Sequence, residues 1–176
     1  MSQQKPMVLD SNVFIEPKNR YYSFDFCPGY WDFLITDFKE GNAVSILPVR
    51  EELLAHEDEL ASWVKNVVPK IHFEDCVRDN SVLAKQLEIA EYVKNNYAKQ
   101  NVVADFLAPD VADSWVIAYA LVHEGIVVTH ETHKPKSKKV SMADVCDQFG
   151  IRHIDVFEFL RQEKAKFIYE KEANTE

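Results

Sequence analysis

Residues 7–12 are Met7-Val8-Leu9-Asp10-Ser11-Asn12, a short apolar run that ends at a carboxylate. A run this brief, bounded by Asp, Ser and Asn, is typical of a buried β-strand. In open parallel sheets, ligands bind beyond the carboxyl ends of the strands. A charge at that edge is costly to bury unless a cation or a substrate faces it. Asp10 is therefore the first candidate functional residue.

Strand and helix patterns alternate along the rest of the chain. Strand-like runs lie at residues 43–47, 126–129 and 152–156, and residues 71–77 fit either a loop or a short strand. Helical patterns cover residues 31–40, 49–68, 80–96 with Asn80-Ser81 as the cap, 109–123, 142–149 and 157–167. This alternation predicts an α/β fold, a three-layer α/β/α sandwich with a mainly parallel sheet of four to five strands. Right-handed crossovers then bring the carboxyl ends of all the strands to the same edge of the sheet.

The 176 residues suit a single domain, which we place at residues 1–170 with a polar tail at 171–176. No apolar run approaches the roughly 20 residues of a membrane span, and the N-terminus has no signal-peptide core. The three cysteines, Cys27, Cys76 and Cys146, are far apart, which predicts reduced thiols and a cytoplasmic location.

The formal net charge is -9. This argues against a general nucleic-acid coat protein, whose affinity comes largely from neutralising phosphates. It does not exclude a nuclease, because acidic metal ligands contribute to the total. An acidic surface would also suit docking to a basic partner.

A second candidate acid is Glu52. The expected buried stripe of the helix at residues 49–68 is formed by Val49, Leu53, Leu60, Val64 and Val67. Glu52 borders this stripe, whereas Glu51 points to the opposite side. First-turn acids also commonly do no more than complement the helix dipole, and this remains the alternative for both residues.

The third candidate is Asp113, which shares a helical face with Ile117 and Ala120. A carboxylate that heads an apolar stripe must find a partner or take up a proton. Asp110 lies one turn earlier on the same face, and its simpler role is that of an N-cap.

The fourth candidate is Glu131, the first acid beyond the strand at residues 126–129. Thr129, the last residue of that strand, could orient a carboxylate or hold a water. Taken alone, Glu131 fits an acid on a surface loop better than a ligand.

In a parallel sheet, Asp10, Glu52, Asp113 and Glu131 all come to the same edge, with Asn12, Asp110 and Thr129 as supporting candidates. Four carboxylates without an arginine cluster call for a hard divalent cation, so we expect one or two Mg²⁺ or Mn²⁺ ions. Such ions can activate water and stabilise charge on a phosphoryl oxygen.

These acids lie in four motifs: Val8-Leu9-Asp10-Ser11-Asn12, Glu52-Leu53, Asp113-Ser114-Trp115-Val116-Ile117-Ala118-Tyr119-Ala120 and Val128-Thr129-His130-Glu131. In this order, the motifs resemble those of the PIN-domain nucleases, the superfamily that contains the VapC-type toxins. More narrowly, Val13-Phe14-Ile15-Glu16, Arg20-Tyr21-Tyr22 and Trp31-Asp32 look like a larger bacterial PIN-like subfamily. Two departures are a Glu at the last acidic position, where many relatives have Asp, and the lack of family motifs over residues 71–101.

The resemblance implies a metal-dependent endoribonuclease that leaves 5′-phosphate and 3′-hydroxyl ends. It also implies the toxin of a toxin-antitoxin pair, with RNA as substrate, a protein antitoxin as partner and a homodimer left open. RNA would then meet the basic and aromatic loops beside the acids, where the candidate contacts are Lys18, Arg20, Lys134, Lys136 and Lys138. For each of these loops, a solvated charge run or simple packing is the alternative.

Two other functions stay open at this point. The Glu at position 131 and the acidic surface are also consistent with an inert interaction module that keeps the fold. A phosphatase with Asp10 as nucleophile usually needs a second Asp two residues later, where this chain has Asn12.

His130 and His133 form a His-x-x-His, but no further His or Cys nearby completes a zinc set, so we expect surface histidines.

Overall fold

The computed structural model describes residues 5–136 and 138–168. Its centre is a five-stranded sheet in the order β3-β2-β1-β4-β5, and all neighbouring strands are parallel. The strands are β1 (Met7–Leu9), β2 (Ala43–Ile46), β3 (Phe73–Glu74), β4 (Ile126–Val128) and β5 (His153–Ile154). The predicted α/β class with a parallel sheet is confirmed. The predicted tail at residues 171–176 lies outside the described residues.

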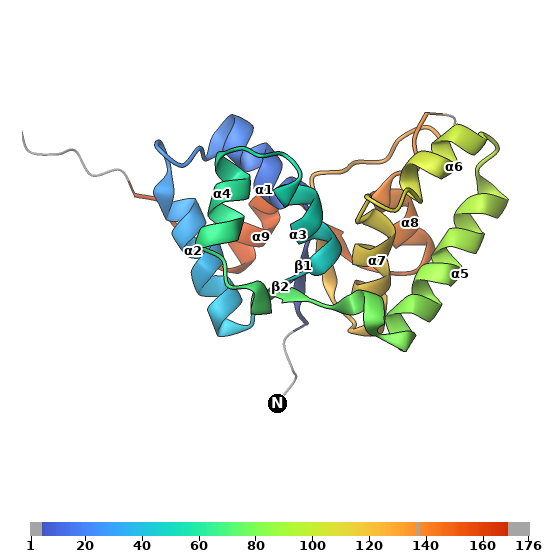
Figure 1. Ribbon diagram of the computed structural model, residues 1–176, viewed down its shortest axis with the longest axis horizontal. Helices are drawn as coiled ribbons and strands as arrows, with labels where there is room; N and C mark the ends of the chain where they lie inside the picture. The colour runs from blue at the N-terminus through green and yellow to red at the C-terminus, as the bar shows by residue number, and fades with distance from the viewer. Residues whose placement is uncertain (1–4, 137, 169–176) are drawn as a thin grey trace, which may run out of the picture.

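Helices cover both faces of the sheet. They are α1 (Asn12–Glu16), the π-helix η1 (Pro17–Tyr21), α2 (Pro28–Glu40), α3 (Leu47–Leu54), α4 (Glu59–Asn66), the 3-10 turns η2 (Lys70–His72) and η3 (Cys76–Arg78), α5 (Asn80–Asn96), α6 (Gln100–Phe106), α7 (Asp113–Val122), α8 (Met142–Gln148) and α9 (Val156–Gln162). In Figure 1, α2, α4 and α9 gather on one side of the strands, and α5, α7 and α8 gather on the other. The molecule is therefore a three-layer sandwich.

Strand β1 lies in the middle of the sheet, and all three of its residues are buried. Its partners on the two sides are β2 and β4, with Leu9 opposite Val128. The close approach to β4 requires Gly125, because a Cβ there would lie 2.7 Å from a Val8 methyl carbon. From β1 the chain builds one half of the sheet through β2 and β3, and then the other half through β4 and β5. The carboxyl end of β1 is thus the topological switch point, where ligands bind in such sheets.

The prediction of a single helix at residues 49–68 is wrong. The chain forms α3 and α4 instead, and Glu57 between them has a positive φ of 46°. Asp58 caps α4 by accepting a hydrogen bond from the Ala61 backbone N–H at 3.0 Å. Helix α3 starts earlier than predicted, at Leu47. Glu52 therefore lies in the second turn of α3 and not at its N-terminus. Val67, expected in the buried stripe, is 53% exposed because α4 ends at Asn66 and Val67 is only its C-cap, whereas Leu60 and Val64 are buried as predicted.

Other boundaries differ from the predictions. Helix α5 is capped by Asp79, whose carboxylate accepts from the Ser81 N–H at 2.7 Å, and not by the predicted Asn80-Ser81. Helix α7 begins at Asp113 with Ala112 at its N-cap, so Asp110 is not the cap but lies exposed in the preceding turn. The sequence did not predict α1, η1 or α6. These short elements rest on tertiary packing, because short helices are marginal by themselves.

Aromatic side chains fill the layer around α2. Trp31 packs between Phe24 and Trp63, with ring centroids 3.9 Å and 4.9 Å away. Tyr30 is fully buried and donates its hydroxyl to the Val13 carbonyl at 2.6 Å. Of the four aromatics at residues 19–29, Tyr22 and Phe24 pack against the core, whereas Tyr21 and Phe26 are 41% and 76% exposed. Over the described residues, no helix combines the length and apolar character that a membrane span requires.

Candidate functional site

Asp10 follows β1 directly and is fully buried. Its Oδ1 accepts a hydrogen bond from the Ser11 backbone N–H at 2.7 Å. Its Oδ2 accepts from Asn12 Nδ2 at 3.1 Å and from the Thr129 hydroxyl at 2.9 Å. These donors hold the carboxylate in one orientation at the end of the central strand.

Thr129 connects Asp10 to the acid beyond β4. While its hydroxyl donates to Asp10, the same oxygen accepts from the Glu131 backbone N–H at 3.1 Å. Glu131 is held from the other side, because its Oε2 accepts from the Met142 N–H at 2.9 Å, at the start of α8. The parallel register of β1 and β4 brings these residues together across 119 positions of sequence.

The other two predicted acids lie in the same place. Glu52 from α3, Asp113 from α7 and Glu131 line one pocket of about 280 Å³ together with Ser11 and Asn12, the residues that bind Asp10. Glu51, on the opposite side of α3, is exposed, whereas Glu52 is half-buried. The structure thus brings together Asp10, Glu52, Asp113 and Glu131.

The shared burial of these acids shifts their proton affinities. Burial raises the pKa of Glu52 to about 7. The charges of Asp10 and Asp110 raise this pKa further, whereas the hydrogen bond of Ser11 and the charge of Lys139 lower it. Burial raises the pKa of Asp113 well above its ordinary value, with further contributions from Asp10 and Glu131. Burial also raises the pKa of Asp10, although the hydrogen bond from Thr129 opposes it. Without a cation, the ionised forms of these groups disfavour one another.

Lys139 partly compensates this charge. Its ammonium forms an ion pair with Glu131 Oε1. Burial lowers the pKa of Lys139, but the hydrogen bond and charge of Glu131 outweigh it and raise the pKa overall. Neither Glu52 nor Asp113 forms an ion pair among the described residues, and Glu52 Oε2 is buried without a hydrogen-bond partner. One ammonium therefore balances only part of the charge of four carboxylates.

These observations fit a divalent cation. Asp10, Glu52, Asp113 and Glu131 offer only oxygen atoms, the ligands that Mg²⁺ and Mn²⁺ prefer. The buried, unpartnered Oε2 of Glu52 and the mutual repulsion of the acids both favour the binding of a positive charge. Among the supporting candidates, Asn12 and Thr129 orient Asp10, and Asp110 acts on Glu52 through its charge.

The predicted RNA-contact residues are spread around this pocket. Lys138 lines it, while Lys18 pairs with Asp58 at 2.5 Å and Arg20 pairs with Glu16 at 2.9 Å. The Lys136 ammonium lies 5.2 Å from the ring centroid of Tyr97, on the side of α5. Ser137, in the same basic run, lies outside the described residues.

Two further hollows adjoin the acidic pocket. One, of about 360 Å³, shares Asn12 and Glu131 with it and is lined also by Arg20, Tyr21, His130 and Lys134. The other, of about 780 Å³, shares Glu52 and Val111 with it and contains Asp110 and Trp115. The acids thus lie in the middle of an extended hollowed surface.

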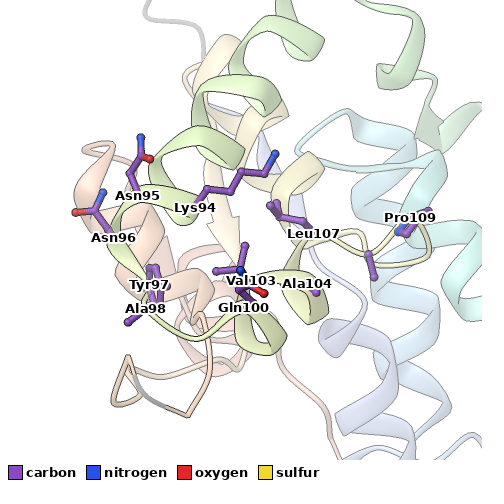
Figure 2. A pocket seen from close by; sticks show the side chains of 11 residues that line it. Lys94, Asn95, Asn96, Tyr97, Ala98, Gln100, Val103, Ala104, Leu107 and Pro109 are labelled. Carbon is purple, nitrogen blue, oxygen red and sulfur yellow. The ribbon is translucent and has the colours of Figure 1, made fainter.

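Another hollow, of about 880 Å³, lies away from the acids. Figure 2 shows its walls, which come from the end of α5, the following turn, α6 and the chain to Pro109. Its lining includes Tyr97, Val103 and Leu107, and no carboxylate, histidine or cysteine. This hollow suits an apolar contact and offers no acid-base or metal chemistry.

Two charged residues of the acidic pocket, Lys139 and Asp105, were not predicted. Lys139 is the last lysine of the basic run at residues 134–139, and the run itself does not indicate that Lys139 turns back to Glu131. Asp105 lines the pocket from α6, a helix that the sequence pattern does not predict. A lysine directly before the buried run that starts at Val140 was the one available signal.

Comparison with curated proteins finds no match to this chain. A family model does match it, with the description "Domain of unknown function (DUF4411)", over residues 7–167. That range includes all five strands and the four acids of the pocket. Because the match covers nearly the whole sequence, the chain belongs to the DUF4411 family.

Proposed function

We propose that this protein is a metal-dependent endoribonuclease, and that Asp10, Glu52, Asp113 and Glu131 hold one or two Mg²⁺ or Mn²⁺ ions. The observation that carries the proposal is the convergence of Glu52, Asp113 and Glu131 in one pocket, next to the buried Asp10 that Ser11 and Asn12 of the same pocket bind, with Glu52 Oε2 buried and unpartnered. The four ordered motifs that resemble PIN-domain nucleases support the same chemistry. The reaction would be hydrolysis of an RNA phosphodiester bond.

When bound, such an ion lowers the pKa of water and offsets negative charge at a phosphoryl oxygen. The protein's own residues would prepare the site for this chemistry. Asn12 and Thr129 hold the Asp10 carboxylate in place, so little reorganisation is needed when a cation arrives. Glu52 Oε2 has a free lone pair and a pKa near 7, which suits it to take up a proton when no cation faces it.

A polymeric substrate is favoured by the shape of the surface. The two hollows that adjoin the acids extend the site in both directions, and they carry Tyr21 on one side and Trp115 on the other. Exposed aromatic rings can stack on unpaired bases, and Arg20 and Lys134 provide positive charge in the first hollow. These contacts suit a single strand better than a duplex groove. A role as the toxin of a toxin-antitoxin pair follows from the resemblance and belongs to the same proposal.

One observation favours a second candidate, an inert interaction module. The Lys139 ammonium already pairs with Glu131, so part of the acidic charge is compensated from within the chain. Calorimetric titration with Mg²⁺ separates the two candidates. Binding with a dissociation constant in the millimolar range or tighter supports the nuclease, and no binding to the folded protein supports the inert module.

Glu52→Gln and its control Glu91→Gln test the proposed activity. Each change removes one carboxylate from a helix, but Glu52 lines the acidic pocket, whereas Glu91 is exposed on α5. With labelled single-stranded RNA and Mn²⁺, we expect Glu52→Gln to lower the cleavage rate by about 100-fold, since it removes a ligand. Glu91→Gln should cleave at the wild-type rate. Equal rates for both variants, or cleavage that survives chelation, would refute the proposal.

A further inference from the structure

A second cluster of metal-ligating side chains lies outside the acidic pocket. His133 follows β4, Asp147 belongs to α8, and His153 belongs to β5. One ligand atom from each residue lies within 4.8 Å of the other two. We propose that these three residues bind a single transition-metal ion of the Zn²⁺ class, with water in the remaining position. This site does not depend on the proposed nuclease function.

The distances between the ligand atoms suit a small tetrahedral ion. Ligand atoms about 2.0–2.1 Å from a tetrahedral zinc lie ~3.3 Å from one another. Here His153 Nε2 lies 3.2 Å from Asp147 Oδ1, and His133 Nε2 lies 3.6 Å from Asp147 Oδ2. Each imidazole therefore lies near one oxygen of the same carboxylate, at close to the separation of two ligand atoms on a tetrahedral ion.

Asp144 supplies the outer partner that metal-binding histidines usually have. Its Oδ1 lies 2.6 Å from His133 Nδ1, and its Oδ2 accepts from the Lys134 backbone N–H at 3.5 Å. With the proton of His133 on Nδ1, the lone pair of Nε2 points toward Asp147. A carboxylate behind the imidazole fixes the tautomer and raises the basicity of the ligand nitrogen. Asp144 and Asp147 come from the same short helix, α8, so one element positions both.

The donor set distinguishes this cluster from the acidic pocket. Two imidazoles and one carboxylate suit Zn²⁺, Co²⁺ or Ni²⁺, whereas an all-oxygen site suits Mg²⁺ or Mn²⁺. His133 and Asp147 have side chains 60% and 57% exposed, so an ion can reach them from solvent. Hydrogen bonding alone explains each pair, but it does not explain why both imidazoles face the same carboxylate.

Binding would connect three segments that are separate in sequence. The ion would tie the chain after Glu131 to α8 and to β5, and so would anchor one end of the segment that carries Lys138 and Lys139. The Ser141 hydroxyl already anchors the other end, because it donates to the Thr132 carbonyl at 3.1 Å. The consequence is a metal-dependent stabilisation of this segment.

Calorimetry with Zn²⁺ tests the site. Protein freed of metal by a chelator is titrated in excess Mg²⁺, in an Asp10→Asn background that weakens the acidic pocket. We expect one Zn²⁺ per chain, and at least a 10-fold weaker association in His133→Ala and in His153→Ala. His123→Ala, which removes an exposed histidine at the end of α7, should bind as the parent does.

Co²⁺ gives a second measurement that reports the ligands directly. The visible spectrum of bound Co²⁺ should indicate four-coordinate geometry and should be lost in Asp147→Asn, with the circular dichroism of the protein unchanged. Retention of Zn²⁺ binding in both histidine variants would overturn the proposal. The proposal would also be overturned if Asp10→Asn by itself abolished Zn²⁺ binding, since the ion would then belong to the acidic pocket.

Discussion

Two clusters of ionisable residues each include a residue of the segment between β4 and α8, Glu131 in the acidic pocket and His133 in the second cluster, and they differ in how their charges are compensated. The four acids of the pocket are buried or half-buried, and burial raises the pKa of Glu52 to about 7. The cluster of His133, Asp147 and His153 is more exposed, and each histidine faces an acid at short distance.

The difference shows that the number of acids alone says little about function. In the exposed cluster, water and neighbouring side chains satisfy the charges, so the residues can remain there at little cost. In the pocket, burial and repulsion disfavour the ionised carboxylates, and either a bound proton or a bound cation removes that cost. The pocket is therefore the stronger candidate for a site that function maintains.

The largest expected effect comes from Asp10→Asn. The amide keeps the size of the side chain but removes the charge that the hydrogen bonds of Asn12 and Thr129 orient. We expect Mn²⁺-dependent RNA cleavage to fall by about 100-fold or more, measured as single-turnover rates. Asp75→Asn, at an exposed acid that does not line the pocket, should cleave like the wild type. An active Asp10→Asn variant would place the chemistry elsewhere in the molecule.

The next effect concerns stability and pH in the absence of divalent ions. The folded pKa of Glu52 is raised from 4.5 to about 7, so the folded state binds the proton more tightly than the unfolded state. Stability therefore falls as the pH rises from about 4.5 to about 7, and it levels off above that. Glu52→Gln should remove this loss and stabilise the protein at pH 8 by about 1–2 kcal/mol, a value reduced for partial exposure.

Denaturant unfolding at pH 5 and pH 8 in the presence of a chelator measures this effect. Asp37 has its pKa raised to about 6 by burial and gives a trend of the same sign, so the difference between variant and wild type is the relevant quantity. Glu51→Gln should follow the wild-type curve. If Glu52→Gln has no effect at pH 8, the pocket is better solvated than its burial indicates.

A smaller effect is expected for Lys139→Gln. The change removes the ammonium that pairs with Glu131, so a divalent ion no longer competes with it. We expect Mg²⁺ to bind about 3- to 10-fold more tightly by calorimetry. The control is Lys85→Gln, which removes an exposed lysine that pairs with Glu88 on α5. Weaker Mg²⁺ binding in Lys139→Gln would contradict the view that the lysine acts as a counter-ion.

The smallest effect should be that of His153→Ala in metal-free protein. Its partner Asp147 is 57% exposed, and exposed ion pairs contribute little to stability. We expect the free energy of unfolding to change by no more than about 0.5 kcal/mol at pH 8. A loss several times larger would show that the two clusters do not differ in the way described above.

The local sequence pattern was sufficient for the layers of the fold. Short apolar runs alternating with helical periodicity predict an α/β sandwich, and strands β1, β2 and β4 lie where the pattern places them. The pattern failed where tertiary packing decides, as in the division of residues 49–68 into α3 and α4. Apolar positions continue across that break, so their spacing does not reveal that Glu57 and Asp58 interrupt the helix.

The acids of the pocket could be nominated from sequence because each stands next to a buried element, and burial is what periodicity reports. Their common location depended on parallel strands, whose carboxyl ends share one edge. What sequence alone could not provide is the compensation of charge through space. The pairing of Lys139 with Glu131 and the meeting of His133 with His153 join residues that no local pattern connects, because the crossovers and the register of β4 and β5 decide which side chains meet.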